Sequence, residues 1–206
     1  MNLSYYFAVS FFLPRGFFMP SVVSTAIARG AWRRFRSNRR GSTAVEFALV
    51  APVFFALLFA IIETGLMFFA NQVLETVTQD SARTIFTGQT QTAGYDEAHF
   101  MSNVVCPPGA VASVLFNCSN ISIDVQRYNS FSNVVISSQI DGGGNFINNM
   151  QYNTGGPCDI VVVRMFYQWP IFVTGLGYNI ANLTGSKRLL SGTAAFRNEP
   201  YNGTCP

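Results

Sequence analysis

Apolar side chains occupy almost every position of one long segment near the amino terminus. Residues 47–62 contain no polar side chain, and after Glu63, Thr64 and Gly65 the apolar run resumes through residues 66–70. The stretch is 24 residues long, whereas a helix needs roughly 20 mainly apolar residues to cross the hydrocarbon core of a bilayer. A buried core helix would rarely run this far without polar residues. The pattern therefore predicts one transmembrane helix.

Helical spacing of apolar residues continues beyond this stretch. Val73, Val77 and Ile85 recur at intervals typical of one helix face. Gly88 suits the left-handed conformation that commonly ends a helix. Pro52 removes one backbone donor and should bend the helix. We expect one long helix, with its first half in lipid and its second half packed on a domain.

The rest of the chain shows the shorter patterns of an α+β domain. A short helix is expected over residues 96–105, before two prolines. Residues 121–126 alternate apolar and polar side chains, which is typical of a half-buried strand. Residues 134–140 are a candidate partner strand, residues 160–169 a central strand, and residues 191–196 a last strand. The predicted fold class is α+β, with a long amino-terminal helix and a small carboxyl-terminal domain containing an antiparallel sheet.

Charge is distributed unevenly around the apolar segment. Residues 1–41 contain seven arginines and no acid, whereas residues 71–206 contain eight acids and six basic residues. Arginine next to a span stays on the cytoplasmic side, so the carboxyl-terminal domain should lie outside the cytoplasm. A nucleic-acid patch is the alternative interpretation of such an arginine cluster. It is not favoured, because the cluster directly precedes an apolar span.

These observations divide the chain into four parts. Residues 1–41 form a basic cytoplasmic leader, and residues 42–70 form the transmembrane segment. Residues 71–88 extend the helix, and residues 89–206 form the head domain outside the cytoplasm. Translation could begin at Met1 or at Met19, and the sequence leaves both open.

All four cysteines fall in the predicted outer domain: Cys106, Cys118, Cys158 and Cys205. An even number in an oxidising compartment suggests two disulfides. Four cysteines allow three pairings, of which we favour the short loop Cys106–Cys118 together with Cys158–Cys205. A metal site is the competing interpretation, but no two cysteines have zinc-ligand spacing and His99 is the one histidine of the sequence. No cofactor, metal or catalytic set is expected, and the protein is not expected to be an enzyme.

The junction between the arginines and the apolar helix has a recognisable order. Gly41 is followed by small or β-branched residues from Ser42 onward and then by Glu46 at the edge of the helix. This order resembles the processing site of type IV prepilins and pseudopilins, which a membrane-embedded peptidase cuts after the glycine. The resemblance implies cleavage between Gly41 and Ser42. A carboxylate inside a membrane is costly, and the resemblance implies that Glu46 meets a free amino terminus within a packed helical bundle.

Three blocks of sequence narrow the resemblance to one family. Residues 41–52 and residues 61–65 are similar to the TadE-like pseudopilins, the minor subunits of the tight-adherence, or Flp-type, pilus. So is the ending Phe-Arg-Asn-Glu-Pro-Tyr of residues 196–201. The resemblance implies that Glu46 and Glu63 act in assembly and subunit register. It marks Arg197, Asn198, Glu199 and Pro200 as a family tail motif.

Two hypotheses for function follow. The first is a minor pseudopilin or assembly component that is held in the inner membrane by one span and processed after Gly41. It has a periplasmic head, enters or primes a surface pilus, and has the membrane, a prepilin peptidase and other pilins as partners, with no nucleic acid. The second is an uncleaved single-pass envelope protein whose outer domain binds a ligand. It explains the topology and the cysteines equally well, but not the prepilin order before the span.

Overall fold

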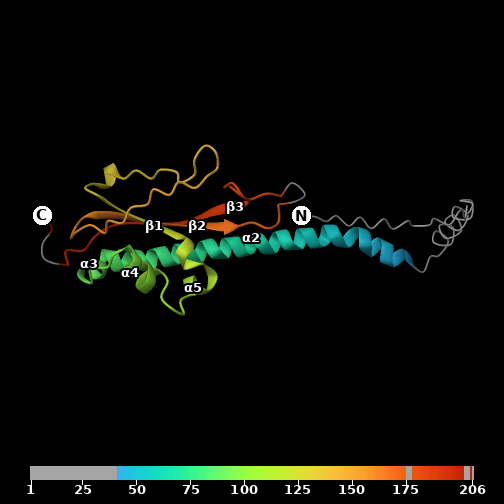
Figure 1. The fold of residues 1–206 in the computed structure, drawn as a ribbon, viewed down its shortest axis with the longest axis horizontal. Helices are drawn as coiled ribbons and strands as arrows, with labels where there is room; N and C mark the ends of the chain where they lie inside the picture. Colours follow the sequence, from blue (N-terminus) through green and yellow to red (C-terminus); the bar gives the residue numbers. More distant parts are fainter. Residues whose placement is uncertain (1–40, 175–177, 202–204, 206) are drawn as a thin grey trace, which may run out of the picture. The chain divides into compact units, whose positions relative to one another are not determined.

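The computed structural model describes residues 41–174, 178–201 and 205. The predicted leader, apart from Gly41, and both candidate start residues lie outside these ranges. Within them the chain has a long helix, a three-stranded antiparallel sheet and several short helices (Figure 1). The predicted α+β class is confirmed.

Helix α2, Ser42–Phe86, is the longest element. It runs through Pro52 and presents one buried stripe from residue 60 onward, with buried positions three or four residues apart: Ala60, Glu63, Met67, Ala70, Leu74, Thr78, Ser81, Ala82 and Ile85. This spacing places the stripe on a single helix face. The helix ends at Phe86, and Gly88 follows with a left-handed φ of 77° and an amide that donates to the Ile85 carbonyl at 3.0 Å. The expected cap at Gly88 is confirmed.

The sheet has the strand order β1-β2-β3. Strand β1 is Ile121–Tyr128, β2 is Ile160–Pro170 and β3 is Lys187–Arg197. The strands predicted over residues 121–126, 160–169 and 191–196 are therefore confirmed, with β2 at the centre. Side chains on both faces of the first part of β2 are buried, as expected for a central strand covered on both sides.

The strand predicted over residues 134–140 is wrong. This segment has no strand and contributes one isolated bridge, between Ile140 and Phe146. Strand β2 pairs with β1 instead, over eight residue pairs. The physical reason is burial, since Val135 and Ile136 are exposed, whereas residues of β2 between two covering layers gain far more from leaving water.

The strands run along helix α2 (Figure 1). Near the carboxyl end of the helix, the rings of Phe86 and Phe196 pack edge to face at 5.9 Å. Midway, a Cβ on Gly192 would lie 2.3 Å from the Thr78 hydroxyl oxygen, so glycine permits a close approach of strand to helix. At the other end, the residues that follow β2 reach Glu63.

Short helices connect α2 to the sheet. They are α3 (Gln89–Thr92), α4 (Glu97–Phe100), a π-helical turn over Met101–Val105 and α5 (Val111–Leu115). The helix predicted over residues 96–105 is confirmed, and the Asp96 side chain caps it by accepting from the His99 amide.

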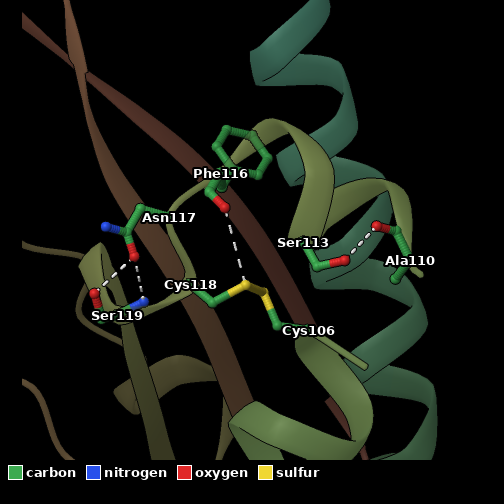
Figure 2. Close-up of a disulfide and its surroundings, with 7 residues drawn as sticks. All are labelled: Cys106, Ala110, Ser113, Phe116, Asn117, Cys118 and Ser119. Carbon is green, nitrogen blue, oxygen red and sulfur yellow. Dashed lines mark hydrogen bonds between the residues drawn. A yellow bond between two sulfur atoms is a disulfide. The ribbon is translucent and has the colours of Figure 1, made fainter. Parts of the chain in front are cut away.

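Two disulfides secure the head, Cys106–Cys118 and Cys158–Cys205. The first closes the excursion that contains α5 (Figure 2). The second ties residue 205 to the turn before β2 across a separation of 47 residues. They are the two bonds of the pairing that the sequence analysis favours.

Candidate functional site

The start of helix α2 contains the predicted processing and assembly residues. Gly41 lies directly before the helix, and Ser42 is its first residue. The Ser42 hydroxyl donates to the Glu46 carboxylate at 3.1 Å. All three residues are exposed. The junction is therefore open to another protein, and the Glu46 carboxylate lies one helical turn from the residue that cleavage would make the new amino terminus.

The part of helix α2 that follows has an apolar surface that no other described segment of the chain covers. Large side chains from Phe47 to Ile62 are exposed on all sides. The most apolar 18-residue window of the helix has a mean hydropathy of 2.6 and is 6% buried. The helix is long and apolar enough to cross a membrane, and it is the one such helix in the described residues. A soluble core helix would have most of this surface covered.

The apolar run is interrupted by a carboxylate that the head domain binds. Glu63 is 8% exposed. Its two carboxylate oxygens accept hydrogen bonds from the consecutive backbone amides of Phe172 and Val173, the latter at 3.0 Å. Beside it, the Thr64 hydroxyl is hydrogen-bonded to the Tyr178 hydroxyl and also donates to the Ala60 carbonyl. We call this contact of Glu63 with Phe172 and Val173 the Glu63 latch.

The latch gives Glu63 partners within its own chain. Backbone amides are strong donors to an ionised carboxylate, and two of them satisfy one oxygen each. Glu46, by contrast, has only the nearby Ser42 hydroxyl as a hydrogen-bond partner in the described residues. The two acidic residues that the sequence groups together thus lie in different surroundings. Sequence analysis missed Phe172 and Val173, and no spacing could have found them, because they contribute backbone amides rather than characteristic side chains.

The tail motif joins the end of the sheet to the end of helix α2. The Glu199 amide donates to the Phe86 carbonyl at 2.9 Å, which satisfies one of the free carbonyls at the helix terminus. Asn198 is buried, and its side-chain amide donates to the carbonyls of Thr154 and Gly156. These contacts fix the last strand to the helix.

The other tail residues support the same corner. The Arg197 guanidinium donates to the Cys158 carbonyl at 2.9 Å. The Tyr201 ring covers Gly88 so closely that a Cβ there would lie 2.2 Å from a ring carbon. Pro200, between them, is exposed. The tail motif thus has a structural role: its contacts stabilise the region where helix α2 ends.

Shifted pKa values in the head have local causes. The His99 amide lowers the pKa of Asp96, and the Asn145 amide lowers the pKa of Asp141. Burial raises the pKa of Tyr152. Asp96 and Asp141 are fully exposed, and in the described residues no group of three or more His, Cys, Asp or Glu could hold a metal ion. Asp96 therefore acts as a helix cap and Asp141 as an acceptor within a turn.

Comparison with known proteins gives one match. Residues 41–83 match the family model described as TadE-like protein. The match covers nearly all of helix α2, and it confirms the resemblance drawn from the junction and the apolar segment. No curated protein and no solved structure matches the chain. The family points to a structural, membrane-associated protein of the tight-adherence pilus rather than to an enzyme.

Proposed function

We propose that this chain, whose helix α2 matches the TadE-like family, is a minor pseudopilin or assembly component of a tight-adherence pilus. It is anchored in the inner membrane by the first half of α2, with its amino terminus in the cytoplasm and its head in the periplasm. A prepilin peptidase removes the leader after Gly41. The mature protein packs against other pilins or pseudopilins, in the membrane or at the surface of the growing pilus.

The observation that carries the proposal is the exposed start of helix α2. A peptidase needs an accessible peptide, and Gly41 is exposed and has no side chain to hinder entry into a narrow cleft. Cleavage there would create an ammonium group on Ser42, whose side chain already contacts Glu46. An ammonium group one helical turn from a carboxylate is attracted to it, and the attraction is strong where water is excluded. Glu46 would then hold the new amino terminus of its own or of a neighbouring subunit.

The arginines before the junction support the orientation. Arg39 and Arg40 directly precede Gly41, and positive charge next to a span is retained in the cytoplasm. The peptidase would therefore act on the cytoplasmic side. The two disulfides support a head in an oxidising compartment such as the periplasm.

Mass spectrometry of the intact protein, extracted from membranes, tests the processing step. In cells that contain the peptidase the chain should begin at Ser42, and in cells that lack it the leader should remain. Gly41→Leu should block the cut, since the new side chain hinders entry to the cleft. Gly65→Leu is the matched control, because a side chain at Gly65 meets open space. An intact leader in cells with active peptidase would defeat the proposal.

A further inference from the structure

The end of the head that contacts Glu63 has an exposed aromatic side chain beside two basic residues. Ile171, directly after β2, donates its amide to the Ser186 carbonyl, at 2.8 Å, so the start of β3 lies beside it. Phe172, whose backbone amide bonds to Glu63, has a side chain that is 83% exposed. Lys187 is exposed, and Arg188 is half-buried. We call the set of Phe172, Lys187 and Arg188 the lower edge of the head.

The level of the lower edge along helix α2 follows from the latch. Residues 42–62 precede Glu63 and comprise 21 residues of the helix, which as an α-helix rise by about 31 Å. The hydrocarbon core of a bilayer is about 30 Å thick. The uninterrupted apolar part of this segment, residues 47–62, rises by about 24 Å, so the helix has crossed most of the hydrocarbon core when it reaches Glu63.

Some of the apolar residues after Glu63 pack against the head. Met67 and Ala70 are buried within the protein core, whereas Leu66, Phe68 and Phe69 remain exposed. Hydrocarbon chains cannot surround a helix whose one face is covered by a sheet. Apolarity alone extends the span to residue 70, but packing ends the fully exposed portion near residue 62.

We propose that the lower edge of the head rests on the outer surface of the bilayer, with Phe172 inserted among the lipids and Lys187 and Arg188 against anionic headgroups. The proposal rests on the membrane anchoring proposed above. An exposed phenylalanine next to basic residues is the composition of surfaces that bind membrane interfaces. Each basic residue near an anionic leaflet contributes attraction that declines within a Debye length.

Charge and continuity favour lipid over a protein partner. The lower edge has two cations, Lys187 and Arg188, and no acidic residue belongs to it. The carboxylate of Glu63 is enclosed by the latch. The edge also continues directly into the exposed apolar part of helix α2, whose side chains need lipid. A protein partner would have to cover Phe172 without displacing the lipid around the adjacent apolar part of helix α2.

The opposite end of the head provides an internal control. Tyr128 ends β1 at the far end of the sheet, and its hydroxyl donates to the carbonyl of Val135, which is 72% exposed. Strand β2 has 11 residues, or about 36 Å at the usual strand rise. Val135 should therefore lie tens of ångströms farther from the bilayer than Phe172.

Spin labelling of the full chain in vesicles of phosphatidylethanolamine and phosphatidylglycerol tests the proposal. A nitroxide is attached to Phe172→Cys, to Val135→Cys as the matched exposed control, and to Phe55→Cys within the span. Collision with oxygen, which concentrates in lipid, is compared with collision with a water-soluble nickel chelate. The oxygen-to-nickel ratio at position 172 should exceed that at position 135 at least threefold and approach that at position 55. Retention of both native disulfides, checked by mass spectrometry, identifies correctly folded variants.

The spin-label ratios distinguish failure of this inference from failure of the membrane anchor. A ratio at position 172 equal to that at position 135, with position 55 in lipid, overturns this inference and leaves the membrane anchor standing. Aqueous ratios at both 172 and 55 overturn the anchor as well. As a second measurement, benzoylphenylalanine placed at Phe172 in cells should crosslink to phospholipid. Crosslinking to protein alone would show that another subunit covers the lower edge and would overturn the lipid assignment.

Discussion

Replacing Glu63 by alanine removes the acceptor of the latch and tests how the head is held on helix α2. Both carboxylate oxygens are engaged, one by the Phe172 amide and one by the Val173 amide. Truncation leaves two backbone donors without a partner. The connection after β2 should then separate from the helix more often, while the sheet, which is secured elsewhere by the core and the disulfides, stays intact.

The magnitude follows from the two hydrogen bonds. A hydrogen bond to a charged group contributes about 1.5–3 kcal/mol, and a donor left buried costs a similar amount. Water can enter at this edge of the head and recover part of that energy, so we expect a net local loss of about 2–4 kcal/mol. Since 1.4 kcal/mol corresponds to a factor of ten, the opening equilibrium should rise roughly 30- to 1,000-fold.

Hydrogen exchange in the full chain, solubilised in mild detergent, measures this opening directly. In the Glu63→Ala variant, the amides of residues 171–174 should exchange faster by the factor given above, and those of β1 should keep their rate. Glu63→Gln retains one acceptor oxygen and should give an intermediate rate. Glu75→Ala is the matched control, because it truncates a glutamate three turns along the same helix that is outside the latch. Exchange at residues 171–174 that stays within twofold of the parent chain would refute the reasoning.

Three further predictions concern assembly and stability. Glu46→Gln should leave the protein in the membrane but reduce its incorporation into pili at least tenfold, measured by immunoblotting of sheared pili; unchanged incorporation would exclude a role for this carboxylate. Replacing Cys158 and Cys205 together by serine opens a loop of 47 residues and should lower unfolding free energy in denaturant by about 4 kcal/mol; a loss below 1 kcal/mol would contradict the entropic account. Asp124→Asn breaks the buried ion pair with Arg164, whose nitrogen lies 2.6 Å from the carboxylate. It should lower the free energy of unfolding by about 3–5 kcal/mol. Replacing Asp124 by leucine and Arg164 by methionine together should recover most of this stability in thermal melts.

Elements whose signal lies within a few turns of the chain could be predicted from the sequence. The apolar run before residue 70, the cap at Gly88 and the strand alternation over residues 121–126 each predicted the element that forms. The strand predicted over residues 134–140 does not form, because β2 takes the place beside β1. Which segment gains that place depends on total burial in the folded domain, which no local pattern measures.

The candidate site likewise contains one part that the sequence predicts and one part that it does not. Gly41, Ser42 and Glu46 are neighbours in sequence and one helical turn apart in space, so their order alone suggested a site. The latch could not be found from sequence, since its donors are 109 and 110 residues from Glu63. Nor could the place of Asn198 and Glu199 at the end of helix α2, which depends on the length of the sheet.

Local patterns in the chain are sufficient to predict that a long apolar helix follows a basic segment and precedes a domain with two possible disulfides. These properties depend on composition and on the periodicity of single elements, which act before any distant contact forms. The folded domain was needed to learn that β2 pairs with β1, that Glu63 is bound by the head, and that one face of the helix after residue 62 is covered by the sheet. The reason is that pairing and burial depend on which distant segments meet, and their free energy is shared among residues that lie far apart in the chain.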